Sequence, residues 1–144
     1  MTAELVQMAV EELQRKFGIV RRSSAVTKEQ LLTELQSIPR GKLPAAIVCA
    51  DGGSVQDDAC VLAMDMGFVI VAPFAANMDG RVRGALEALD AALDLFPPGR
   101  ARRLRTPGGI WADYFVRRFY PLDLARDYAA FAIELELKSA PGGV

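Results

Sequence analysis

The alternation of hydrophobic and polar residues is clearest near the C-terminal end of the chain, over residues 131–138. Every second position there is hydrophobic, namely Phe131, Ile133, Leu135 and Leu137. The positions between them are mostly polar, namely Ala132, Glu134, Glu136 and Lys138. A period of two is typical of a strand with one face in the core and the other in solvent. The pattern therefore predicts a half-buried strand.

The segment before this strand, from Trp111 to Tyr120, is rich in aromatic residues and arginine. Aromatic residues favour strands, so we expect a second strand here. Pro121-Leu122-Asp123 indicates a corner between the two strands, because proline and aspartate are common in turns. Residues 100–109 are expected to form a loop or a short edge strand.

Two amphipathic helices are predicted by hydrophobic residues spaced three and four positions apart. The first covers residues 2–17, with Thr2 as its cap and Gly18 as its stop. The second covers residues 79–96, with Asp79 as its cap. A proline pair directly after the second helix ends it.

A shorter helix, from Thr27 to about Ser37, is indicated by a capping box formed by Thr27 and Gln30. Pro39 ends this helix. Residues 19–22 before it are expected to be a short extended piece. Alternatively, the whole segment is a mobile excursion between the first helix and the first long strand.

Two hydrophobic strands are expected in the middle of the chain, at residues 45–50 and 60–72. The first is followed by Asp51-Gly52-Gly53-Ser54, which lacks the phosphate-loop pattern and is interpreted as a hairpin turn. Asp65 and Gly67 interrupt the second strand and indicate a bulge or a bend.

Residues 68–72 are hydrophobic at every position. Such a run is usually buried on both faces of a sheet. One layer of helices covers only one face, so a second subunit on the other face is one way to bury the run.

These elements predict a mixed α+β fold (α/β in the broad sense) in one domain of residues 1–138, with residues 139–144 as a flexible tail. The expected order is α-(α)-β-β-α-β-β, with a mostly antiparallel sheet packed on the two amphipathic helices. A chain of 144 residues, 51% of them hydrophobic, is large enough to bury its own core. No hydrophobic run reaches the ~18 residues that cross a bilayer. The acidic N-terminal segment does not resemble a signal peptide, so we expect cytoplasmic synthesis and no membrane partner.

The chain contains no histidine. This removes Ser-His and Cys-His catalysis and the commonest zinc ligand sets. No other catalytic signature is present in the sequence, and we expect no enzymatic activity, no catalytic residue, no cofactor and no metal. Cys49 and Cys60 lie in hydrophobic segments and are interpreted as buried reduced thiols. A disulfide or a metal pair is the alternative for these two cysteines.

A second candidate for metal chemistry is a group of carboxylates in and beside the two central strands, namely Asp51, Asp57, Asp58 and Asp65. Carboxylate oxygens bind Mg²⁺ or Ca²⁺, and a metal-dependent hydrolase is conceivable on this basis. The spacing is not that of an EF-hand calcium loop. A solvated hairpin tip that discourages strand pairing explains these residues more simply.

Arginine dominates the basic residues, with 13 arginines among the 17. Four of them fall between Arg100 and Arg105, and Arg117 and Arg118 follow. Three interpretations stay open: a solvated loop, a protein interface that pairs with a neighbour's acidic residues, and contact with DNA or RNA. The net charge of −1 argues against the last one, because nucleic-acid modules usually carry a wide basic excess. Packing, rather than base stacking, explains the nearby aromatic residues more simply.

The order of these segments resembles that of the tail terminator proteins of tailed bacteriophages, in particular the Mu-like group. The resemblance covers most of the chain and is weakest at residues 21–44. It rests on the first helix, the short strand with the long strand after it, and three later segments, Phe96-Pro97-Pro98-Gly99, Phe115–Asp123 and Phe131–Leu137. Tail-completion and head–tail joining proteins are close neighbours of this group.

The resemblance implies a structural virion protein whose subunits form a hexameric ring. Such a ring caps the head-proximal end of the tail tube, stops its polymerisation and presents a surface to the head–tail connector or neck protein. The implied partners are other copies of the chain, the tail tube protein, the connector, and genomic DNA that passes through the lumen without sequence-specific binding. The implied location is the virion tail, after synthesis in the cytoplasm of the bacterial host.

The resemblance implies no active-site residues. Our hypothesis is that Arg102, Arg103 and Arg105 lie on a loop at a ring or tube interface. Arg117 and Arg118 are expected near a subunit boundary. The alternative function is a small nucleic-acid-binding domain that uses the arginine-rich segment 100–105.

Overall fold

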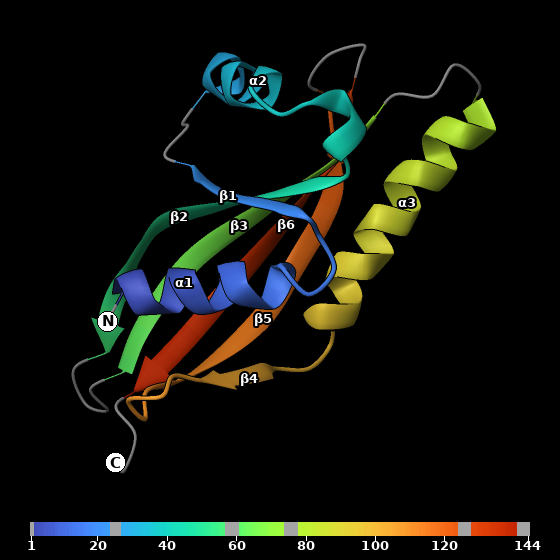
Figure 1. Cartoon of the computed structure of the whole chain (residues 1–144). Coiled ribbons are helices and arrows are strands. Elements are labelled where there is room, and N and C mark those ends of the chain that lie inside the picture. The colour runs from blue at the N-terminus through green and yellow to red at the C-terminus, as the bar shows by residue number, and fades with distance from the viewer. Residues whose placement is uncertain (1, 24–26, 57–60, 74–77, 124–127, 141–144) are drawn as a thin grey trace.

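The computed structural model describes residues 2–23, 27–56, 61–73, 78–123 and 128–140 (Figure 1). These residues contain three α-helices, one short 3-10 helix and six strands. In chain order the elements are α1 (Thr2–Leu13), β1 (Ile19–Ser23), α2 (Lys28–Gln36), η1 (Arg40–Lys42), β2 (Ala45–Gln56), β3 (Val61–Pro73), α3 (Met78–Leu95), β4 (Arg102–Arg105), β5 (Trp111–Leu122) and β6 (Tyr128–Ala140).

The six strands form one sheet in the order β1-β2-β3-β6-β5-β4. Only β1 and β2 pair in parallel, and all the other neighbours are antiparallel. Parallel neighbours need a long connection, and the segment that carries α2 supplies it. The predicted α+β fold with a mostly antiparallel sheet is therefore confirmed. The segment before β2 carries β1 and α2, as the first of the two interpretations expected.

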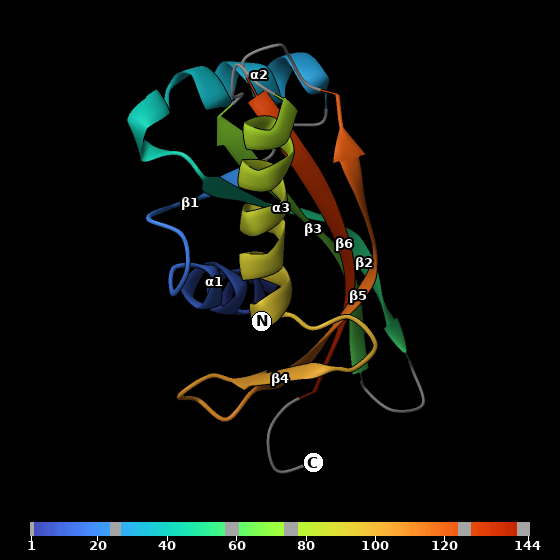
Figure 2. The same cartoon turned by 90° about the vertical axis from the view of Figure 1, so that its right-hand side faces the viewer.

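One face of the sheet is covered by α1 and α3, as Figure 2 shows with the sheet nearly edge-on. The inward residues of β3 and β6 lie opposite one another in register, for example Phe68 beside Ile133 and Met66 beside Leu135. Each of these side chains is at most 2% exposed. The period of two predicted for β6 is confirmed, since its apolar positions face this core.

The opposite face of the sheet is covered at one end by α2. Leu35 and Ile38 of this helix segment pack on Ile47 and Val71 of the central strands. Val71 is fully buried by residues of its own chain. The suggestion that a second subunit buries the 68–72 run is therefore not needed at this position.

The two predicted amphipathic helices have different ends from those expected. α1 ends at Leu13 rather than at residue 17, because the amides of Arg15 and Lys16 bond to carbonyls three residues back, those of Glu12 and Leu13, and tighten the last turn. Phe17 is still buried, which explains why its hydrophobic position matched the helical repeat. α3 begins at Met78, so Asp79 lies inside the helix and is not its cap.

The predicted hairpin turn at residues 51–54 is wrong. β2 continues through these residues to Gln56, paired with β3 along its whole length. The bulge also lies in β2, between Ala50 and Gly52, and not at Asp65 or Gly67. Pairing with a long neighbouring strand outweighs the weak strand preference of the two glycines. The true connection between the strands lies outside the described residues.

The end of the chain is more regular than predicted. β5 runs through Pro121 and Leu122, which were expected to form a corner. Proline is tolerated there because the outer side of this part of β5 has no paired strand among the described residues. β6 continues to Ala140, and Ser139 is fully buried, so these two residues are not part of a tail.

Two local predictions are confirmed. The side chain of Thr27 accepts a hydrogen bond from the Gln30 amide, and the Gln30 side chain accepts one from the Thr27 amide. The segment after α3 contains the short edge strand β4, which was one of the two alternatives for residues 100–109.

Candidate interaction surface

The outer edge of β5 is partly open. β4 pairs only with residues 111–114, and no other described strand lies beside residues 115–122. A bulge between Val116 and Arg118 interrupts the pairing of β5 with β6 on its inner side. Bulges, arginines and Pro121 are devices that discourage unwanted strand pairing at an edge. We therefore expect contacts at this edge through side chains rather than through an added strand.

Arginine–carboxylate pairs line the solvent face of β4, β5 and β6. Arg103 donates two hydrogen bonds of 2.8 Å to Asp113, which is its register partner on β5. Arg118 donates bonds of 2.5 and 3.0 Å to Glu134, which is its register partner on β6.

The same row of pairs includes Glu136 of β6. Arg117 donates a hydrogen bond to this carboxylate, and the ammonium of Lys138 lies 3.9 Å from it. The hydroxyl of Tyr120 donates a 2.8 Å hydrogen bond to Glu134, next to the pair with Arg118. We call this row of ion pairs the ladder. Most of its charges are neutralised within the chain.

These ion pairs shift the pKa values of the residues that form them. The hydrogen bond from Arg103 lowers the pKa of Asp113, and the hydrogen bonds from Arg118 and Tyr120 lower the pKa of Glu134. The hydrogen bonds to these two carboxylates raise the pKa values of the Arg103 and Arg118 guanidinium groups. Because the arginines are mostly exposed, solvent screens each pair, and the pairs add little to stability. The ladder sets the position of the side chains more than the stability of the fold.

Arg102 lies on the other face of β4, where it pairs with α1. Its Nη2 atom donates a 3.1 Å hydrogen bond to Glu12, which also binds Arg15. Its Nε atom is buried and has no hydrogen-bond partner among the described residues. Arg105 makes no ion pair with a described residue. The five predicted interface arginines therefore do not form one patch, because Arg102 is turned toward the core side.

The aromatic residues of β5 divide between the core and the surface. Tyr114 is 1% exposed and its hydroxyl donates a 2.7 Å hydrogen bond to the carbonyl of Leu5 in α1. Phe115 and Phe119, in contrast, are 38% and 45% exposed. Composition placed these two phenylalanines in one group with the other aromatic residues of the segment and did not separate the exposed rings from the buried ones. The alternation of residues along β5 and β6 accounts for the exposure of Phe115, because Phe115 lies in register with the solvent-facing Glu136.

Guanidinium groups also lie over two aromatic rings of this surface. The guanidinium carbon of Arg103 lies 4.4 Å from the centre of the Trp111 ring, and that of Arg118 lies 4.8 Å from the Tyr120 ring. A cation over an aromatic face is attracted by the negative charge of the ring face. The arginines are thus held by both charge and stacking.

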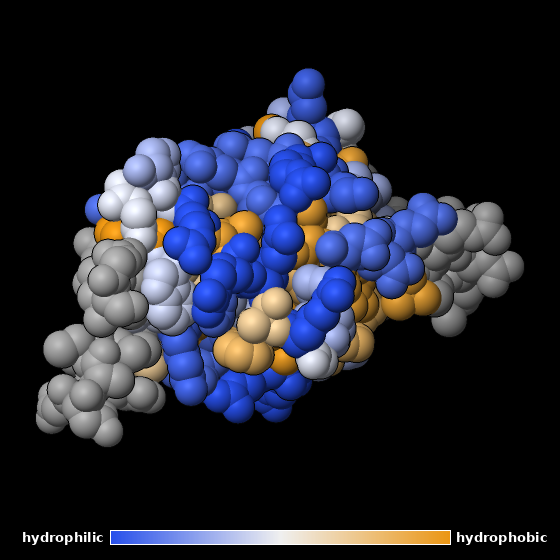
Figure 3. Space-filling model, turned by 90° about the horizontal axis from the view of Figure 1, so that it is seen from below, coloured by the Kyte–Doolittle hydropathy of each residue, from blue (hydrophilic) through white to orange (hydrophobic). Residues whose placement is uncertain are grey.

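A hollow of about 400 Å³ opens at the exposed part of β5. It is bordered by Gly99, Arg100, Phe115, Val116, Arg117, Glu136 and Lys138. We call this hollow the β5 groove. Figure 3 views the molecule from below, the end where β4 lies, and shows strongly hydrophilic residues with hydrophobic atoms between them.

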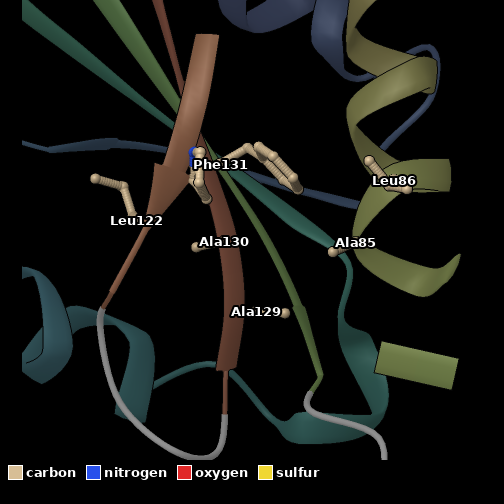
Figure 4. Close-up of a pocket in the computed structure, with 7 residues that line it drawn as sticks. Ala85, Leu86, Leu122, Ala129, Ala130 and Phe131 are labelled. Carbon is tan, nitrogen blue, oxygen red and sulfur yellow. The ribbon is translucent and has the colours of Figure 1, made fainter. Parts of the chain in front are cut away.

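A second, smaller hollow of about 160 Å³ lies between α3 and the ends of β5 and β6 (Figure 4). Its lining is almost entirely apolar and consists of Ala85, Leu86, Pro121, Leu122, Ala129, Ala130 and Phe131. The lining contains no acid, base or nucleophile, so this hollow offers shape and apolar surface rather than chemistry.

The described part of the chain contains no group of three or more acidic or cysteine residues arranged to hold a metal ion. Asp65 is exposed on β3, and Asp57, Asp58 and Cys60 lie outside the described residues. Cys49 is partly buried beside the α2 cluster. No described helix is long and apolar enough to span a membrane.

No protein-family model matches this chain, and no curated protein matches it either.

Proposed function

We propose that this protein is a structural subunit of a phage tail, a tail terminator whose copies form a ring at the head-proximal end of the tail tube. The resemblance of the sequence to this group supports the proposal. The exposed part of β5 supports it from the structural side. In this role the protein acts by shape and association, and it carries out no reaction.

The observation that carries the proposal is the composition and exposure of residues 115–122. Phe115 on the solvent face and Phe119 on the helix-covered face are both exposed there, on an edge without a second strand among the described residues. Arg117 and Arg118 lie between them in β5. Aromatic residues and arginine are enriched in protein interfaces. They also supply most hot spots of binding energy. This surface therefore fits a protein that works in an assembly.

The ring has three kinds of neighbour in this proposal. Its side surfaces contact other copies of the chain, one end contacts the last layer of the tail tube protein, and the other end offers a surface to the connector or neck protein. Genomic DNA passes through the lumen without sequence-specific contacts. A ring that covers the last layer of tube subunits removes the surface on which the next layer would assemble, and growth stops.

Polymerisation of purified tail tube protein from the same phage tests the proposal. We expect tubes grown with this protein to stop at a shorter, narrower range of lengths than tubes grown without it. Electron micrographs give the two length distributions. Identical distributions at excess protein would contradict the proposed function.

Direct nucleic-acid binding through residues 100–105 is less favoured by the contacts. Arg102 and Arg103 are engaged by carboxylates of their own chain, which leaves fewer free positive charges for phosphates. We expect weak binding of double-stranded DNA in a fluorescence anisotropy titration at 150 mM salt. Tight binding that falls steeply with added salt would reverse this order of preference.

A further inference from the structure

The β5 groove carries an excess of positive charge beside an exposed aromatic ring. Arg100, Arg117 and Lys138 are positive and Glu136 is the one acidic residue in its lining, which leaves an excess of two positive charges. Arg100 is exposed and makes no ion pair with a described residue. A partner for this groove should therefore carry carboxylates next to an apolar side chain.

The outer face of α3 has that chemistry. Leu86 is 42% exposed, and Glu87, Asp90 and Asp94 are exposed on the same side of the helix. The opposite side of α3 is buried against the sheet, through residues such as Leu89 and Ala92. From residue 84 to 95 the helix carries no basic residue. We call this surface the α3 stripe.

We infer that the α3 stripe of one copy docks in the β5 groove of the next copy. The inference rests on the proposed function, because it identifies the contact between subunits of the ring. The groove and the stripe are different surfaces of the same chain. A contact between two different surfaces joins copies head to tail, and it closes into a ring when the rotation between copies allows.

In this contact the Leu86 side chain packs on the exposed ring of Phe115. Glu87 and Asp90 lie near Arg100 and Lys138, where they balance the excess charge of the groove. Burial of the two apolar side chains supplies affinity, and the charges set the orientation of the copies. The association should therefore weaken with added salt, because exposed charges are screened.

Two charge-reversed variants test the contact. The helix variant is Glu87→Lys/Asp90→Lys, and the groove variant is Arg100→Glu/Lys138→Glu. Each variant alone brings like charges together, so we expect association about a hundredfold weaker than that of the wild type in analytical ultracentrifugation. In a 1:1 mixture every contact joins opposite charges again, and we expect assemblies of alternating composition to re-form.

The control is Glu4→Lys/Glu29→Lys, which makes the same change in net charge as the helix variant, at exposed positions of α1 and α2. It should associate like the wild type. Thermal unfolding of each variant checks that it folds. If the groove double variant is unfolded, Arg100→Glu alone replaces it, with an expected loss of about tenfold.

A helix variant that associates like the wild type overturns the inference. So does a 1:1 mixture that stays dissociated, a control that dissociates like the two variants, or a wild-type chain that stays monomeric at every concentration. None of these results decides the proposed function, which is judged separately by the growth of tail tubes. Tubes of unchanged length would overturn that function even if the variants behave as expected here.

Discussion

The hydrogen bond between β5 and α1 gives a sharp test of how β5 is fixed against the helix. The hydroxyl of Tyr114 donates a 2.7 Å hydrogen bond to the backbone carbonyl of Leu5. Burial raises the pKa of this hydroxyl, so it stays protonated as a donor. Tyr114→Phe removes the hydroxyl but keeps the ring, whose centre lies 5.4 Å from that of Phe96.

The expected cost of Tyr114→Phe is that of one net hydrogen bond. Leu5 lies in α1, where its carbonyl also accepts the helical bond from four residues ahead, so it is not left without a donor. We therefore expect the free energy of unfolding to fall by about 1 kcal/mol. For a domain of this size, that loss lowers Tm by about 3 °C.

Urea unfolding, followed by the fluorescence of the single tryptophan, Trp111, measures this loss. The midpoint should fall by about 0.5 M with an unchanged slope, given slopes of about 1–3 kcal/mol per molar urea. Tyr120→Phe is the matched control, because its hydroxyl binds Glu134 at the solvent face. Its effect should stay within about 0.5 kcal/mol. Equal midpoints for Tyr114→Phe and the wild type would refute the reasoning, as would equal losses in the two variants.

Three further predictions concern the ladder, the α2 cap and the exposed edge. Because the folded pKa values of Asp113 and Glu134 are lowered, their contribution to stability is complete above their unfolded pKa values, near 4, and is lost as pH falls through the folded values. The urea midpoint should thus fall less from pH 7 to pH 3 in Asp113→Asn/Glu134→Gln than in the wild type, and an equal fall would contradict the pairing. Thr27→Ala should cost about 1 kcal/mol of unfolding free energy, whereas Thr27→Ser should restore most of it, in the same urea assay. Phe115→Ser should leave the unfolding free energy within about 1 kcal/mol of the wild type and weaken self-association in sedimentation. Unchanged sedimentation would exclude Phe115 from the interface.

Patterns that depend on neighbours in the sequence were predicted correctly. The alternation in β6 and the capping box at Thr27 and Gln30 are set by residues at most a few positions apart, and both are confirmed. The position of the three helices and the mostly antiparallel sheet follow from the same local signals. Local chemistry was thus enough for the type of most elements.

Features that depend on distant pairing were not predicted correctly. Glycines at 52 and 53 indicate a turn in isolation, yet they lie in β2 because β3 and β6 continue the sheet beside them. The covering of Val71 by α2 depends on how the crossover between β1 and β2 folds back. No periodicity in the sequence contains this information.

The candidate surface shows the same division. Arginine-rich composition indicated the segments of β4 and β5 as candidates, but composition did not reveal which arginines are engaged by their own chain. The pair Arg118 and Glu134 exists because the β5 bulge sets the register between the two strands. Arg102 turns toward α1 because its neighbour Arg103 occupies the solvent face of β4. Strand register, rather than residue type, therefore assigns the role of each arginine.

The central claim is that this protein ends the growth of a tail tube. The most direct test is to label the purified protein with gold, add it to growing tubes of the cognate tube protein, and record by electron microscopy where the label lies and whether labelled ends grow further. The account predicts label at one end of each tube, with no further growth at that end. Label along the tube wall, no label, or continued growth past a labelled end would contradict it.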